Sequence, residues 1–241
     1  MLKVPKVNGI IEEAFKKVLA KYGKRSFKEL IETQSFSKVI NEIEEEANNL
    51  YKYYEKEAIR NYIRAKGLEG REATEALLKA IDNSLVTSIA NIRRARAGLT
   101  SEKILINALR ELGIPCQRSN IKRGGYKPDI SIPNDQCINV DANMGFVLAV
   151  KRTLRERWGE DVPIFNNFPN SAFILIKPDP DFTIERAKDM VERGMKLIYI
   201  PDELYEKYKV ELKSMFKDYF KKLSELPKDL ENFLKQKGYI K

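Results

Sequence analysis

Residues 146–158, FVLAVKRTLRERW, join an apolar run to a cluster of charges. Five apolar residues precede Lys151, and such a run fits a covered strand. Three arginines and a glutamate then fall within the next seven residues. Upstream, the segment KPDISIP places Asp129 at the start of another strand-like run. Because burying a charge costs free energy unless the charge is paired, this arrangement predicts a functional site.

The second half of the chain alternates strand-like and helical patterns. The strand-like runs are DISIP, QCINV, GFVLAV, SAFILIK and MKLIYIP, and turn residues separate them. Helical spacing of apolar residues marks SEKILINALRELGI, FTIERAKDMVERG and ELYEKYKVELKSMFKDYFKKLSEL. This alternation predicts an α/β fold with a mixed five-stranded sheet flanked by helices.

The first half of the chain has a different character. Residues 9–97 show a nearly continuous helical pattern, with stops at Gly23 and Gly67. The pattern changes near Gly98. We therefore expect an N-terminal helical module at residues 1–97 and an α/β domain at residues 98–241.

Composition limits the classes of protein that the chain can belong to. With 43% hydrophobic and 33% charged residues, it is an ordinary globular sequence, and no apolar run approaches the roughly 20 residues of a membrane span. The first residues lack the apolar core of a signal peptide, which predicts a cytoplasmic protein. Cys116 and Cys137 show neither metal-binding spacing nor a disulfide framework. The net charge of +9 favours a polyanionic partner such as nucleic acid.

The chain contains no histidine. This absence excludes hydrolases that use an imidazole base and nucleases or proteases that use histidine as a metal ligand. Hydrolysis would have to rely on carboxylates, lysine and a hard metal ion. Asp129 and Lys151 suit this chemistry, since a carboxylate can hold Mg²⁺ while an ammonium orients the attacking water and offsets negative charge. The alternative is an ordinary turn aspartate and a solvated lysine at a strand end.

Five ordered blocks resemble a known family: RARAGLTSE, GIPCQR, KPDISIP, AVKRTLRERW and VERGMKLIYIPDELYEKYKVEL. Together, over roughly residues 93–212, they resemble the catalytic domain of type II restriction endonucleases of the EcoRII-like and CCGG-cutting group, within the PD-(D/E)xK nuclease superfamily. The resemblance implies a restriction-endonuclease-like core in the second half of the chain.

The resemblance also implies roles for individual residues. Glu102 matches the acidic residue of the helix before the first strand, Asp129 matches the metal-binding aspartate, and Lys151 matches the catalytic lysine. The superfamily usually has an acid two residues before this lysine, but Ala149 stands there. Members of the group supply the missing carboxylate from the helix that follows the lysine.

The second acidic ligand departs from the family pattern. Residues 163–165, PIF, occupy the place of the helical glutamate. Glu160 lies about one helical turn earlier, and on the same face of a helix, so we expect it to be the second metal ligand. Asp161 is the alternative.

The segment LRERW aligns with the family's DNA-reading residues. Arg155 and Glu156 are expected to read adjacent bases in the major groove, because a guanidinium donates to guanine and a carboxylate accepts from cytosine. Trp158 is expected to belong to the core. Arg157, Arg94 and Arg96 are expected to contact the DNA backbone. For Arg94 and Arg96 the alternatives are a subunit interface and ordinary surface charge.

The resemblance and the charge together predict a Mg²⁺-dependent enzyme that cuts both strands of DNA. A palindromic site implies a homodimer, possibly assembled into a tetramer, with the helical module contacting DNA or the second protomer. The site is expected to contain CCGG, or CC and GG separated by one base. Two alternatives remain: a non-catalytic DNA-binding regulator that uses IRRARAG, and a repair or structure-specific nuclease.

Overall fold

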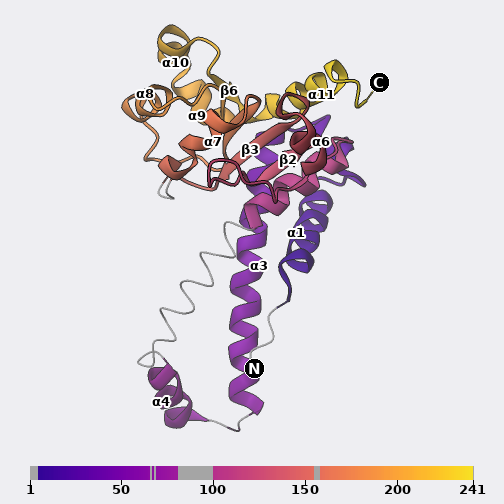
Figure 1. Cartoon of the computed structure of the whole chain (residues 1–241). Coiled ribbons are helices and arrows are strands. Elements are labelled where there is room, and N and C mark those ends of the chain that lie inside the picture. Colours follow the sequence, from indigo (N-terminus) through magenta and orange to yellow (C-terminus); the bar gives the residue numbers. More distant parts are fainter. Residues whose placement is uncertain (1–4, 66, 68, 81–99, 155–157, 241) are drawn as a thin grey trace.

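A computed structural model of the chain describes residues 5–65, 67, 69–80, 100–154 and 158–240. Within these residues a sheet of six strands has helices on both faces (Figure 1). The strands follow chain order across the sheet, from β1 to β6. The pairs β1–β2 and β2–β3 are antiparallel, and the remaining pairs are parallel. The predicted mixed α/β fold is confirmed.

The strands are short except at the centre of the sheet. They are β1 (Gln117–Arg118), β2 (Ile130–Ile132), β3 (Phe146–Lys151), β4 (Ser171–Leu175), β5 (Ile198–Ile200) and β6 (Phe220–Lys222). The central strands β3 and β4 are nearly all apolar, as expected for strands that are covered on both faces.

Successive residues of the central strands β3, β4 and β5 pack into two separate hydrophobic clusters. In β3, Leu148 and Val150 join the first cluster, whereas Val147 and Ala149 join the second. Helices of the first cluster are α1 (Val7–Lys21), α2 (Phe27–Ile31), α3 (Phe36–Ala65), a helix at residues 100–111 and α11 (Leu226–Gln236). Helices of the second are α7 (Val162–Asn167), α8 (Ile184–Glu192), α9 (Asp202–Lys207) and α10 (Lys209–Phe216). The sheet therefore separates two cores.

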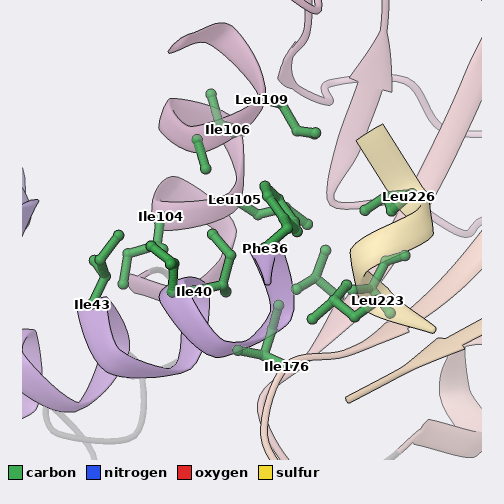
Figure 2. Close-up of a cluster of buried hydrophobic side chains, with 14 of the residues drawn as sticks. Phe36, Ile40, Ile43, Ile104, Leu105, Ile106, Leu109, Ile176, Leu223 and Leu226 are labelled. Atoms are coloured by element: carbon green, nitrogen blue, oxygen red, sulfur yellow. The ribbon is translucent and has the colours of Figure 1, made fainter. Parts of the chain in front are cut away.

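The N-terminal helices pack directly on the sheet. Figure 2 shows Phe36, Ile40 and Ile43 of α3 together with Ile176, which follows β4, and Leu223. Beyond this contact α3 extends away from the sheet, and α4 (Gly70–Ala80) lies near its far end (Figure 1). The proposed boundary between residues 97 and 98 falls outside the described residues and stays a prediction, although the two regions share one hydrophobic cluster.

The predicted helix stops agree with the structure. α1 ends just before Gly23 and α3 ends just before Gly67, and both glycines have positive φ, 63° and 60°. Glycine enters this left-handed region without the steric cost that a Cβ brings, so it ends a helix readily. Among the described helices, none is both long enough and apolar enough to cross a membrane.

The predicted strand QCINV is wrong, since these residues belong to the short helix α6 (Asp135–Val140). Pro133 precedes it and has no N–H for a strand ladder. The side chain of Asn134 then accepts a hydrogen bond from Cys137 N at 3.0 Å, which caps a helix. A 3₁₀ turn, Ala142–Met144, leads on to β3.

The predicted long helix over residues 203–226 is also wrong. α9 and α10 are followed by Lys217 with φ of 50°, then by β6, a 3₁₀ turn and α11. Phe220 is 2% exposed and pairs with Ile198 of β5, so burial on the sheet edge overrides the helical spacing of the sequence. The sequence did not indicate β6 or the two-residue β1. With these two strands gained and QCINV lost, the described sheet has six strands rather than five.

Candidate active site

Asp129 and Lys151 meet at the carboxyl end of β3. Asp129 immediately precedes β2, and its backbone N–H donates to Leu148 O at 3.0 Å, continuing the antiparallel ladder. Its side-chain Oδ2 accepts a hydrogen bond from Val150 N at 2.7 Å. The carboxylate therefore lies beside the last residue of β3, which is Lys151.

Asp161 completes this group from a different element. It ends a 3₁₀ turn, Trp158–Asp161, and its Oδ2 lies 2.8 Å from Lys151 Nζ. Both side chains are largely shielded, with 13% of Asp161 and 18% of Lys151 exposed. An ion pair this sheltered from water is weakly screened by salt.

Trp158 anchors the turn that carries Asp161. Its side chain is 6% exposed within the second hydrophobic cluster, so its prediction as a core residue is confirmed. The guanidinium groups of Arg186 and Arg193 lie 5.7 and 5.3 Å from the centre of its ring. These contacts hold the turn against α8 and direct Asp161 back toward the sheet.

Glu102 approaches the group from the helix at residues 100–111. Its Oε2 accepts a hydrogen bond from Arg118 Nε of β1 at 3.0 Å. Burial raises the pKa of Glu102, and the charge of Asp129 raises it further, while Arg118 opposes both effects. Glu102 and Asp129 are thus electrostatically coupled. No role was expected for Arg118, although it is the last residue of the block GIPCQR.

The other two carboxyl groups also have raised pKa values. Burial raises the pKa of Asp129, against the opposing effects of the Val150 N–H and the Lys151 ammonium. Burial also raises the pKa of Asp161 to about 6, and the charge of Asp129 adds to the rise while Lys151 opposes it. Together with Glu102, these acids form a site in which negative charge is concentrated and poorly hydrated, which favours a cation.

The oxygen donors at this site suit a hard divalent cation. In the part of the chain that the structure describes, no group of three or more Asp, Glu, Cys or His residues could form an all-protein metal cage. Mg²⁺ does not need one, since it is usually bound through one or two carboxylates together with water and substrate phosphates. Asp129 and Asp161 provide two carboxylates near Lys151, so the residues fit Mg²⁺ completed by a substrate.

Glu160 lies next to this group, but its side chain is exposed. Its charge raises the pKa of Asp161. The contact with Lys151 described above is made by Asp161, the alternative from the sequence, and the role of Glu160 as a metal ligand stays a prediction. The residues predicted to contact DNA lie outside the described residues: Arg155, Glu156, Arg157, Arg94 and Arg96.

The sheet is mixed, with an aspartate just before one antiparallel strand and a lysine at the end of the next. This is the architecture of the restriction endonucleases. The family model described as "EcoRII C terminal" matches residues 51–218, and the chain belongs to this family. The match confirms the resemblance inferred from the five sequence blocks. No curated protein matches the chain significantly.

Solved structures support the same fold. The chain is similar to the restriction endonuclease PspGI in its complex with substrate DNA, with a TM-score of 0.72 and 24% identity over 97% of this chain and 94% of that one. It is also similar to metal-depleted Ecl18kI in complex with uncleaved DNA, with a TM-score of 0.71 and 17% identity over 99% of this chain and 82% of that one.

Proposed function

We propose that this protein is a type II restriction endonuclease that makes Mg²⁺-dependent double-strand cuts at a palindromic DNA site. One observation carries the proposal: Asp129, Lys151 and Asp161 converge at the carboxyl end of β3 within a fold of the EcoRII C-terminal family. We propose that the enzyme acts in the cytoplasm.

Each residue of the group has a role that follows from its chemistry. Asp129 and Asp161 would hold Mg²⁺, which when bound polarises the phosphate and lowers the pKa of water. Lys151 orients the attacking water and offsets the negative charge that develops on the phosphate. Its neighbour Asp161 keeps the ammonium in place at 2.8 Å. Glu102 supports the site through its electrostatic coupling to Asp129.

Recognition would begin four residues after Lys151. We propose that Arg155 and Glu156 read adjacent guanine and cytosine bases, and that Arg157, Arg94 and Arg96 contact phosphates. The site would contain CCGG, or CC and GG separated by one base. Its twofold symmetry requires a homodimer for simultaneous cutting of both strands, and two dimers can pair into a tetramer. The net charge of +9 supports DNA as the partner.

Digestion of plasmid DNA tests the proposal. Purified protein with Mg²⁺ is expected to give discrete bands, and sequencing of the cut ends gives the site and the cut position. Smears or nicks at irregular structures would indicate a repair nuclease instead. Intact plasmid with a sequence-specific gel shift would indicate a regulator. EDTA should abolish cutting, and Mg²⁺ added in excess should restore it.

A further inference from the structure

A buried carboxylate on α3 forms an ion pair with the residue immediately after Lys151. Glu44 is 2% exposed, although it is charged and lies in an acidic stretch of the helix, with Glu45 and Glu46 directly after it. Its Oε1 pairs with the guanidinium of Arg152, and its Oε2 lies 2.8 Å from Lys177 Nζ. A carboxylate this deeply buried is tolerated only because two cations surround it.

Glu44 and the candidate active site lie on opposite faces of the sheet. Consecutive residues at a strand end point to opposite faces, so Lys151 reaches Asp161 on one side while Arg152 reaches Glu44 on the other. Two backbone hydrogen bonds hold the same residues against the end of β4, from Ile176 N to Lys151 O at 2.9 Å and from Lys177 N to Arg152 O at 3.2 Å. Figure 2 shows Ile176 beside α3.

A second buried carboxylate holds the next part of the chain. Asp179 is 3% exposed, and its Oδ2 accepts a hydrogen bond from Leu154 N. Its Oδ1 accepts from Asp181 N at 2.9 Å, which fixes the carboxylate in its own loop. Residues 152–154 are therefore anchored at both ends, and they connect Lys151 to the segment that begins at Arg155.

We propose that Glu44 is a positioning residue that couples DNA recognition to cleavage. By holding Arg152, it fixes the position of residues 152–154, which join Lys151 to the residues that are proposed to read the bases. The inference rests on the proposed function and deepens it. A buried ion pair adds little to stability when compared with an apolar replacement, but it can define one geometry among several. A shift of about 1 Å in a catalytic group costs about 100-fold in rate.

The test compares Glu44→Gln with Glu42→Gln, a matched control on the same helix. Glu42 also pairs with a lysine, at 2.8 Å from Lys21 Nζ, and with Tyr22, but both partners belong to the N-terminal helical region. Arg152→Gln and the double variant Glu44→Gln with Arg152→Gln complete the set. The readouts are single-turnover cleavage at saturating Mg²⁺ and DNA, on the mapped site and on a duplex with one altered base pair, together with thermal unfolding.

Glu44→Gln and Arg152→Gln should each cut the mapped site about 100-fold more slowly, and the preference for that site over the altered duplex should fall. The double variant should be no slower than the slower single variant, because both remove one contact. Glu42→Gln should keep the rate and preference of the wild type. If Glu44→Gln does not fold, Arg152→Gln, whose side chain is 25% exposed, gives the same comparison.

Two results would overturn the inference while leaving the proposed function intact. In the first, Glu44→Gln or Arg152→Gln loses thermal stability but keeps the cleavage rate and the preference of the wild type. In the second, the losses of the two single variants multiply in the double variant. A wild-type protein that cuts no DNA would instead overturn the proposed function itself, and this inference with it.

Discussion

Replacing Asp161 with asparagine should stabilise the protein and abolish its response to Mg²⁺. Burial raises the pKa of this carboxyl from 3.8 to about 6. A folded-state pKa above the unfolded-state value means that the carboxyl favours folding fully below pH 3.8 and that this contribution is lost as the pH rises through about 6. At neutral pH the folded protein therefore carries the cost of an ionised, poorly hydrated carboxylate.

The cost follows from the shift. Each pKa unit corresponds to about 1.4 kcal/mol, so the ionised Asp161 destabilises the folded state by about 3 kcal/mol near pH 8 and by about half of that near pH 5. Asparagine keeps the shape but carries no charge. Asp161→Asn should therefore unfold at a higher urea concentration than the wild type, with a larger gain near pH 8 than near pH 5.

Mg²⁺ should narrow this difference in stability between the wild type and Asp161→Asn. A ligand that binds only the folded state stabilises it by about 1.4 kcal/mol at ten times its dissociation constant, so wild-type stability should rise with Mg²⁺. Asp161→Asn should respond little, and Glu160→Gln, at the exposed neighbouring position, should respond like the wild type. Urea titrations with and without Mg²⁺ measure all three proteins. Loss of the response in Glu160→Gln and its retention in Asp161→Asn would refute the assignment of Asp161.

Three further outcomes are expected. Asp129→Ala and Lys151→Ala should each abolish cleavage but still bind the mapped site in gel shifts. If either variant cuts at a tenth of the wild-type rate, that residue is not part of the mechanism. Arg155→Ala should weaken binding to the mapped site by about 1–3 kcal/mol and binding to a scrambled duplex very little. Glu156→Ala should reduce discrimination at the paired cytosine, and Arg157→Ala should weaken binding to both duplexes equally. Binding to any duplex should weaken steeply with salt, since each neutralised phosphate contributes about −0.9 to the slope of log K against log salt, and a flat dependence would argue against DNA as the partner.

Strand prediction succeeded where burial alone decides the structure. β3 and β4 are covered on both faces, so their apolar runs have no competing helical interpretation. β6 could not be found in this way, because Phe220 is its one buried residue and the surrounding lysines continue a helical pattern. The strand forms only because β5 offers an edge beside it, which is information that the local sequence does not contain.

Ala149 shows why the second acidic residue was the hardest part of the site to predict. It is fully buried, pairs in register with Phe173 and packs in the second hydrophobic cluster, so this position of β3 provides no carboxylate beside Lys151. The acid that approaches Lys151 must come from another element, and Asp161 does so because Trp158 is buried against α8. Spacing along the chain assumed a regular helix after Lys151, which favoured Glu160 over its neighbour. The structure has a 3₁₀ turn at residues 158–161, whose placement depends on which elements Trp158 packs against, and the expectation that Trp158 is buried did not specify them. The role of Glu160 as a metal ligand stays a prediction.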